Sequence, residues 1–312
     1  MGKRILVTGG AGFVGGYLCS ALLEDGHSVT AVDDLSNGRK ENIAPGVEFI
    51  LLDITSRDLF EKLASYSFDT VIHCAAQASN ALSFLDPHRD FEVNQLGTLK
   101  VLELCVEKKI ERFVFTSSMS VYGQAGTLPT KETEACYPDA YYAVHKLASE
   151  HYIRIYEEQH GLQYTIFRLY TTYGHGQNLE NRDQGLLSIY LSYILNKDTL
   201  IVKGSKDRTR DIVNVDDLVR AMKLSLDNPK SYGNVYNLGS GKSIKIEKIV
   251  DLLTTGLGYE KDQFPVSYEG ATAGDPFDTL ADIEAAKTDL GWVPEISAEE
   301  GIRLTLEKVK RG

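Results

Sequence analysis

The sequence is poor in cysteine and contains no long apolar run. Its four cysteines, Cys19, Cys74, Cys105 and Cys136, stand far apart and form no Cys-x-x-Cys pair, so their spacing indicates neither a disulfide framework nor a zinc site. No apolar stretch approaches the ~20 residues that a transmembrane helix requires, and the N-terminal segment lacks the apolar core of a secretory signal. We therefore expect a cytoplasmic protein with reduced thiols and no membrane contact.

Basic residues are also in deficit. The 312 residues include 33 Lys and Arg against 44 Asp and Glu, which gives a formal net charge of −11. A general binder of nucleic acid or of an anionic membrane would show a basic excess, so both classes are disfavoured. Any phosphate must instead be met by local positive charge. Hydrophobic residues make up 43% of the chain, which is enough for a sizeable core.

Short runs rich in β-branched residues alternate with helical patterns in the first half of the chain. The runs lie at 4–8, 28–32, 47–52, 70–74, 112–116 and 164–168. Apolar residues at helical spacing lie between them, as at 15–25 and 94–108. This alternation predicts an α/β doubly wound parallel sheet, a Rossmann domain, over residues 1–170.

Beyond residue 170 the rhythm breaks into shorter, glycine-punctuated pieces. Helical patterns recur at 215–226, 244–257 and 298–309. We expect a second, smaller α/β lobe over residues 171–312 that binds the substrate, with the segment at about 210–230 packing back onto the first lobe. Ligands of such folds sit beyond the carboxyl ends of the parallel strands, so the cleft should lie between the two lobes.

A glycine-rich turn follows the first expected strand, in Thr8-Gly-Gly-Ala-Gly-Phe-Val-Gly15. Gly9 permits a tight turn, Gly12 lets a pyrophosphate approach backbone N–H groups, and Gly15 lets the next helix pack on the strand. The second strand run leads into Asp33-Asp34, where a carboxylate would bind the adenosine ribose and repel a 2′-phosphate. The sequence therefore predicts NAD rather than NADP.

A tyrosine and a lysine stand four residues apart in a helical segment. Tyr142 and Lys146 would project from one helix face. The free pKa of tyrosine is about 10, and a nearby ammonium group favours the phenolate, which is the basic form. Ser118, in a hydroxyl cluster after the fifth run, is placed to bind the same substrate oxygen. A Tyr-x-x-x-Lys spacing also occurs on ordinary surface helices, so the pair matters because of its neighbouring motifs.

The ordered motifs resemble those of the extended short-chain dehydrogenase/reductase family, in particular its NAD-dependent nucleotide-sugar epimerases and dehydratases. The likeness continues through His73-Cys-Ala-Ala-Gln-Ala-Ser79, Tyr173-Gly174, Arg210-Asp-Ile-Val-Asn-Val-Asp-Asp217 and Leu290-Gly-Trp-Val-Pro294. The resemblance implies a catalytic set of Ser118, Tyr142 and Lys146. It also implies an NAD site, with candidate residues Gly9, Gly12, Phe13, Val14, Gly15, Asp33, Asp34, Leu35, Ser36, Asn37, Gly38, Asp53, Ile54, Ala75, Ala76, Gln77, Asn94, Thr116, Tyr142, Lys146 and Tyr170.

The resemblance further implies that Arg210 meets the diphosphate of a nucleotide sugar from the second lobe. A surface ion pair between Arg210 and Asp211 is the alternative for this residue. Members of the family commonly form homodimers through two paired helices, expected here at 94–108 and 138–160. The candidate substrate contacts are Ser79, Ser118, Thr171, Gln184, Lys203, Arg208, Arg210 and Asp275.

Three places depart from the family pattern. Met119-Ser120 replaces the Asp-Glu pair with which dehydratases expel water, and methionine is no general acid. Thr171 stands where the family often has Asn. Thr272 replaces a second diphosphate-binding arginine and cannot make a bidentate phosphate contact. Possible substitutes for that arginine are Arg182, Lys203, Lys206 and Arg208.

The expected function is NAD-dependent 4-epimerisation of a nucleotide-linked hexose, by oxidation to a 4-keto sugar and re-reduction. UDP-glucose and UDP-galactose are the expected pair, although the residues do not fix the nucleotide or the sugar. A nucleotide-sugar reductase and an atypical dehydratase are the alternatives. A non-catalytic NAD-binding sensor is disfavoured because Ser118, Tyr142 and Lys146 are all present.

Overall fold

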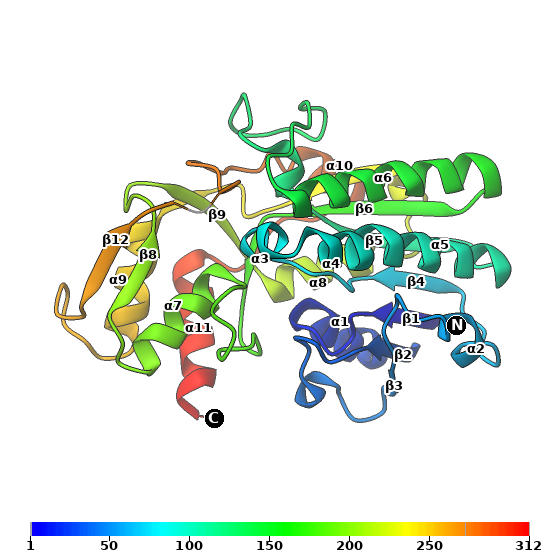
Figure 1. The fold of residues 1–312 in the computed structure, drawn as a ribbon, viewed down its shortest axis with the longest axis horizontal. Helices are drawn as coiled ribbons and strands as arrows, with labels where there is room; N and C mark the ends of the chain where they lie inside the picture. Colours follow the sequence, from blue (N-terminus) through cyan, green and yellow to red (C-terminus); the bar gives the residue numbers. More distant parts are fainter. Residues whose placement is uncertain (1, 272, 312) are drawn as a thin grey trace.

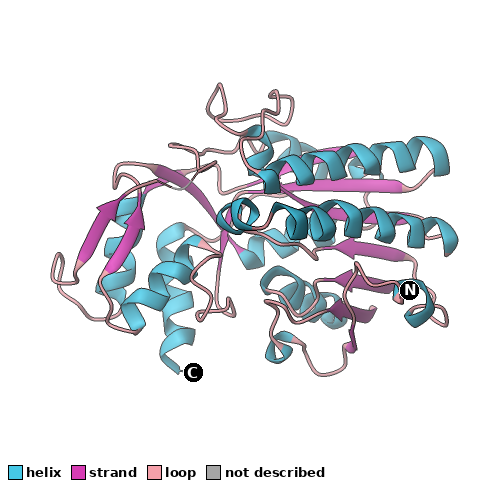
Figure 2. Cartoon of the chain, viewed as in Figure 1, coloured by secondary structure: helices cyan, strands magenta, loops and turns pink. Residues whose placement is uncertain are grey.

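The computed structural model describes residues 2–271 and 273–311. A large part built around a parallel sheet lies beside a smaller part in which two short sheets meet helices (Figure 1). Figure 2 shows the long helices of the large part running alongside its strands. Within the described residues, no helix is both long and apolar enough to cross a membrane.

Seven parallel strands form the sheet of the large part, in the order β3-β2-β1-β4-β5-β6-β10. Six of them correspond to the six runs in the sequence, and the prediction of a doubly wound α/β fold is confirmed. The order reverses between β1 and β4, and strands at such a switch point leave a crevice for a ligand. The strands are β1 (Arg4–Thr8), β2 (Ser28–Asp33), β3 (Glu48–Leu51), β4 (Thr70–His73), β5 (Arg112–Ser118), β6 (Gln163–Leu169) and β10 (Asn234–Leu238).

The seventh strand, β10, comes from the range that we assigned to the second lobe. It pairs with β6, and its Tyr236 and Leu238 are buried in the same core as Leu18 of the first lobe. The run Asn-Val-Tyr-Asn-Leu is short and half polar, which is why hydrophobic periodicity gave it no weight. The range 171–312 therefore contains elements of both parts.

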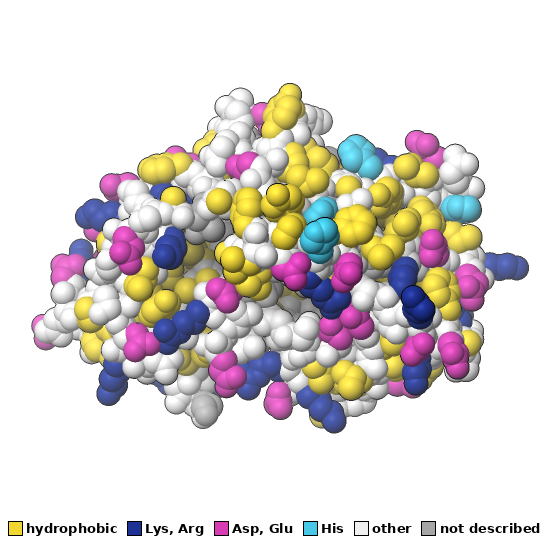
Figure 3. All heavy atoms as spheres, viewed as in Figure 1, with side chains coloured by type: hydrophobic (Ala, Val, Ile, Leu, Met, Phe, Trp, Pro, Cys, Tyr) yellow, Lys and Arg dark blue, Asp and Glu magenta, His cyan; other side chains and the backbone are white. Residues whose placement is uncertain are grey.

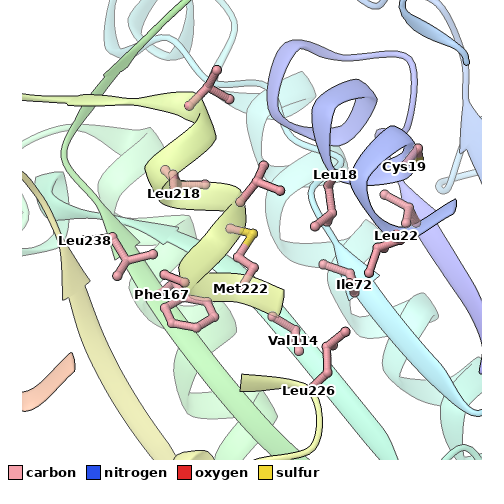
Figure 4. Close-up of a cluster of buried hydrophobic side chains, with 14 of the residues drawn as sticks. Leu18, Cys19, Leu22, Ile72, Val114, Phe167, Leu218, Met222, Leu226 and Leu238 are labelled. Atoms are coloured by element: carbon pink, nitrogen blue, oxygen red, sulfur yellow. The ribbon is translucent and has the colours of Figure 1, made fainter. Parts of the chain in front are cut away.

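Helices cover both faces of the sheet. On one face Leu18 and Leu22 of α1 and Leu218 and Met222 of α8 enclose a core over β1, β4, β5 and β6 (Figure 4). On the other face, residues of α5 and α6 such as Val101 pack over the same sheet. The helices of this part are α1 (Phe13–Glu24), α2 (Leu59–Lys62), α3 (Asn80–Leu85), α4 (Pro87–Phe91), α5 (Thr98–Glu107), α6 (Tyr141–His160), α8 (Val215–Ser225) and α10 (Glu284–Leu290).

The smaller part has its own core. Tyr173, Tyr190, Leu253 and Leu306 are buried there among other apolar side chains. Its two sheets have the orders β11-β9-β7 and β12-β8. The elements are β7 (Thr171–Tyr173), α7 (Leu186–Leu195), β8 (Leu200–Lys203), β9 (Thr209–Asn214), β11 (Ser243–Lys245), α9 (Ile246–Gly256), β12 (Val266–Glu269) and α11 (Ala298–Arg311).

The helix expected over 94–108 is interrupted in its first turns. The segment Glu92–Gly97 is a π-helix, and the α-helix α5 begins only at Thr98. The Asn94 carbonyl accepts hydrogen bonds from the hydroxyls of Thr98 (2.7 Å) and Ser149 (2.8 Å). Single π-helical turns are rare in proteins, and those that occur often lie at functional sites. This one presents Asn94 toward the loop after β4.

Candidate active site

The turn between β1 and α1 has the geometry of a dinucleotide-binding loop. Gly9 has φ +70°, and a Cβ there would lie 2.6 Å from the Ala75 nitrogen. A Cβ on Gly15 would collide with the Gly9 carbonyl oxygen, so the helix can approach the strand only with glycine here. A Cβ on Gly12 would meet only the Gly9 oxygen, at 3.1 Å, and would otherwise fill open space in front of the helix N-terminus. That open cradle fits a pyrophosphate.

Asp33 lies at the end of β2, beside the glycine turn. Its carboxylate accepts hydrogen bonds from the N–H groups of Ala11 (3.0 Å) and Leu35 (2.8 Å). A Cβ on Gly38 would come within 2.6 Å of Asp33 Oδ1, so the loop wraps closely around the acid. Burial raises the pKa of Asp33, and the two backbone hydrogen bonds oppose that rise. Ionised in this place, Asp33 suits the two hydroxyls of an adenosine ribose.

An arginine that the sequence did not single out pairs with two of the candidate NAD residues, Asp34 and Asp53. Arg89 Nη2, from α4, lies 3.1 Å from Asp53 Oδ2 and 3.6 Å from Asp34 Oδ2. Asp34 also accepts hydrogen bonds from the hydroxyl (2.6 Å) and N–H (2.9 Å) of Ser36. Ile54 is buried in the core behind Asp53. No local motif marks Arg89, because its partners lie far from it in the sequence.

The three expected catalytic side chains lie at the carboxyl end of β5. Burial raises the pKa of Tyr142 to about 12, and the Ser118 hydroxyl beside it acts in the opposite direction. Lys146 is 2% exposed, donates to the Thr116 carbonyl (2.9 Å) and lies over the Phe115 ring. Burial lowers the pKa of Lys146 to about 8. The lysine is thus close to its titration point near neutral pH and can respond to nearby charge.

The loop after β4 is fixed to the π-helical turn. The Gln77 N–H donates to Asn94 Oδ1 (3.1 Å), and Asn94 Nδ2 donates to the Gln77 carbonyl (2.9 Å). Ser79 caps α3 by accepting from the Leu82 N–H (3.2 Å). Ala75 and Ala76 lie between β4 and Gln77 and are half-buried. Their side chains are single methyl groups and project little from the backbone. Next to Ser79, Asn80 Nδ2 donates to the Gly274 carbonyl (3.1 Å), so this loop lies against the smaller part.

Two buried arginines of the smaller part are held by one carboxylate. Arg208 Nη1 and Arg210 Nη2 lie 2.5 and 2.6 Å from the two oxygens of Asp275, and their side chains are only 7% and 5% exposed. Arg210 therefore pairs with Asp275 rather than with Asp211, whose carboxylate accepts from the backbone N–H groups of Gly241 and Ala281. The carbonyl of Lys203 accepts from Arg208 Nη2.

The position of Arg208 bears on the arginine missing at position 272. Thr272 itself lies outside the described residues. Among the four candidate substitutes, Lys206 pairs with Glu247 and Arg182 with Asp198, both at exposed sites. Arg208 is the buried one, beside Arg210.

Four amide side chains join the loop after β2 to the smaller part. This loop holds candidate NAD residues, among them Asn37, and is called the cofactor loop below. Asn37 Nδ2 donates to Gln184 Oε1 (2.6 Å), and Asn181 Nδ2 donates to Asn37 Oδ1 (2.8 Å), with Asn178 Nδ2 at 3.5 Å. Gln184, a candidate substrate contact, is thus placed against a candidate cofactor residue. Asn42 extends the link by donating to the carbonyls of Ala11 and Gly176.

The remaining candidates lie at the start of α1 and around β7. Phe13 and Val14 begin α1 and pack partly on the first core. Thr171 is half-buried in β7. Tyr170 is buried, and among the described residues its hydroxyl has no hydrogen-bond partner.

A glycine cradle, an acid at the end of the second strand and a Ser-Tyr-Lys set on a doubly wound sheet define the class of NAD-dependent redox enzymes. The model of the NAD dependent epimerase/dehydratase family matches residues 5–239. The chain belongs to this family, which confirms the resemblance found in its motifs and the expectation of NAD.

Several epimerases are similar to this chain over nearly the whole length of both proteins. A UDP-glucose 4-epimerase of Mycolicibacterium smegmatis is 33% identical over 310 residues, which cover 97% of each chain. The crystal structure of a UDP-glucose 4-epimerase of Thermotoga maritima with UDP-glucose has a TM-score of 0.93 at 34% identity, covering 99% of both chains. That of a Thermus thermophilus UDP-glucose 4-epimerase with NAD has a TM-score of 0.90 at 30% identity, covering 98% of this chain and 99% of the other.

Proposed function

We propose that the protein is an NAD-dependent 4-epimerase of nucleotide-linked hexoses, with UDP-glucose and UDP-galactose as its substrate pair. One observation supports the proposal most directly: Ser118, Tyr142 and Lys146 gather at the carboxyl end of β5, in the sheet whose first strand leads into the glycine turn. In the smaller part, Asp275 holds the buried Arg208 and Arg210 together. The likeness to UDP-glucose 4-epimerases over the full chain supports the choice of sugar and nucleotide.

The three catalytic side chains have complementary roles in this proposal. Bound NAD supplies a reversible hydride acceptor for the sugar carbon C4. Tyr142, as phenolate, removes the proton of the C4 hydroxyl and later returns it. The Lys146 ammonium favours the phenolate, and Ser118 donates a hydrogen bond to the same sugar oxygen. Met119-Ser120 offers no acid group that could expel water.

Arg208 and Arg210 would hold the diphosphate. Each guanidinium has five N–H donors, of which Asp275 uses one and backbone carbonyls use two, so two remain on each. Asp275 thereby holds the two groups side by side, with donors left for phosphate oxygens. Anchoring the substrate through its diphosphate leaves the sugar ring free to rotate. A keto sugar that has rotated is re-reduced on its opposite face, which inverts the configuration at C4.

The amide cluster of Asn37, Asn178, Asn181 and Gln184 would keep NAD in place between the two half-reactions. An epimerase must not lose its reduced cofactor before the hydride returns. A strap of hydrogen bonds from the smaller part across the cofactor loop slows that loss.

We also propose a cytoplasmic homodimer that uses α5 and α6. Val106 on α5 and Val144 and Ile155 on α6 are exposed, as are Phe84 and Leu85 of α3. Figure 3 shows hydrophobic side chains gathered over the α3, α4 and α6 region. Such patches on a protein surface typically mark an interface. The four free cysteines suit a reducing compartment.

The test is to incubate the purified protein with UDP-, dTDP-, GDP- and CDP-hexoses without added cofactor and to separate the products by chromatography and mass spectrometry. We expect UDP-glucose and UDP-galactose to interconvert at unchanged mass. Water loss would indicate a dehydratase, and a need for stoichiometric NADH would indicate a reductase. Failure to interconvert the UDP pair would reject the proposal.

A further inference from the structure

A fully buried carboxylate lies behind the catalytic residues. Asp90, on α4, is 0% exposed. Its Oδ2 accepts from Gln77 Nε2 (2.6 Å) and Asn94 Nδ2 (3.0 Å), and its Oδ1 lies 2.5 Å from His145 Nδ1. Within the described residues no Lys or Arg forms an ion pair with it. Burying a carboxylate without a permanent cation costs free energy, and the core would tolerate an apolar residue more cheaply.

The partners of Asp90 come from three separate elements of the site. Gln77 belongs to the loop after β4, where its amide also binds both the N–H and the carbonyl of Ser79. Asn94 lies in the π-helical turn. His145 lies on α6, immediately before Lys146 and three residues after Tyr142. One carboxylate therefore joins the loop after β4 and the π-helical turn to the helix that holds the proposed catalytic pair.

We propose that Asp90 and His145 form a positioning pair, in which Asp90 fixes the Gln77 loop and the first turns of α6 and acts by its charge on Tyr142 and Lys146. The inference rests on the proposed function, since it assigns these two residues to the same reaction. Neither residue belongs to a recognisable motif of the sequence, and neither is itself placed to touch the substrate.

The electrostatic part of the proposal has a definite sign. Burial has the largest effect on both groups, raising the pKa of Tyr142 and lowering that of Lys146, and the Asp90 charge adds a smaller upward contribution to each. The other groups that act on these two are Ser118 from β5, Cys74 from the loop after β4, and Glu150 on α6. Removing the Asp90 charge lowers both pKa values. Activity that needs a phenolate and an ammonium group then shifts to lower pH on both limbs of its pH profile.

The decisive variant is Asp90→Asn, assayed for sugar interconversion across pH. We expect both limbs to move toward acid by about one pH unit, with kcat reduced more than KM is raised. A merely structural defect lowers the height of the profile and leaves the limbs in place. Limbs that stay in place would overturn the electrostatic role.

His145 variants test the hydrogen bond separately. His145→Phe should reduce kcat by about tenfold, because α6 loses its bond to Asp90. His145→Asn places an amide N–H near the position of Nδ1 and should restore most of the loss. Equal loss in both variants would contradict the pair. His151→Asn, at an exposed position of the same helix, is the matched control and should behave as wild type.

A readout without turnover keeps the inference separate from the proposed function. In long-range ¹H–¹⁵N spectra of the histidine rings we expect a His145 Nδ1–H whose resonance moves in Asp90→Asn. A His145 ring that ignores this substitution overturns the pair, whatever the activity. A wild-type protein that interconverts no nucleotide sugar refutes the proposed function instead, and the pair's role in that reaction with it. An active wild type with unchanged variants refutes the positioning role alone.

Discussion

The proposed active site has two ends, one for the cofactor and one for the substrate, and they consist of different kinds of groups. The proposed cofactor end is made mostly of backbone, namely the glycine turn and the N-terminus of α1, with one carboxylate, Asp33, that two N–H groups hold in place. The proposed substrate end is made of long charged side chains, Arg208 and Arg210, which Asp275 holds together. A backbone site admits few sequences, whereas a guanidinium can reach one point from several chain positions. The first end is therefore regular, and the second departs from the family pattern.

The largest effect is expected between the two ends, at the reacting hydroxyl. Tyr142→Phe removes the only proton acceptor assigned to the reaction and should reduce kcat by about 10³-fold. NAD content and thermal stability should stay at wild-type values. Product formation measured by chromatography checks the rate, and substantial residual turnover would show that another group acts as the base.

The arginine pair should control substrate affinity. Arg208→Gln and Arg210→Gln should each raise KM for UDP-glucose by about 10- to 100-fold, because a charge-assisted hydrogen bond to phosphate is lost. NAD binding should not change. Steady-state kinetics measure the effect, with Lys206→Gln as the exposed control that keeps wild-type values. Should Arg208→Gln behave like the control, the second diphosphate contact comes from elsewhere.

Asp33 tests the cofactor end. Asp33→Asn should weaken NAD binding by about tenfold and narrow its preference over NADP, since the charge that repels a 2′-phosphate is gone. KM for the sugar nucleotide should be unaffected. Titration calorimetry with both cofactors gives the ratio. Asp34→Asn is the neighbouring control. If it weakens NAD binding more than Asp33→Asn does, the ribose is bound by Asp34 and not by Asp33.

The smallest effect is expected at the amide cluster that joins the two ends. Asn37→Ala removes the hydrogen bonds to Gln184 and Asn181 and should speed NAD loss by about three- to tenfold, which matches one or two neutral hydrogen bonds. NAD retained after repeated gel filtration is the measure. Asn196→Ala, at an exposed position after α7, should retain NAD as wild type does. An equal half-time in both variants would leave the cluster without this role.

The same contrast explains what the sequence could predict. Gly9, Gly12, Gly15 and Asp33 work through contacts with their near neighbours or with the adjacent strand, so their spacing is enough to recognise them. The six runs that became β1 to β6 show hydrophobic patterns that need no knowledge of the rest of the chain. Tyr142 and Lys146 were found because one helix turn separates them.

Other residues of the site depend on distant partners. Asp90 meets His145 across 55 positions, and Arg89 meets Asp53 across 36. No local pattern reports such contacts, so the buried carboxylate and this arginine emerged only from the fold. Arg208 stood among four candidates, and burial beside Arg210 singled it out. The strand β10 is short and half polar, and its partner β6 supplies what the local sequence does not.

The path of the chain restricts how this architecture can be rebuilt. After β6 the chain enters the smaller part, returns to the sheet through α8 and β10, leaves again for β11, α9 and β12, returns as α10 and ends in the smaller part with α11. The smaller part is thus not one contiguous segment joined to the sheet by a single linker. A chimera that imports another substrate specificity must exchange several discontinuous segments at once, and the separate spans after β6 and after β10 must evolve together.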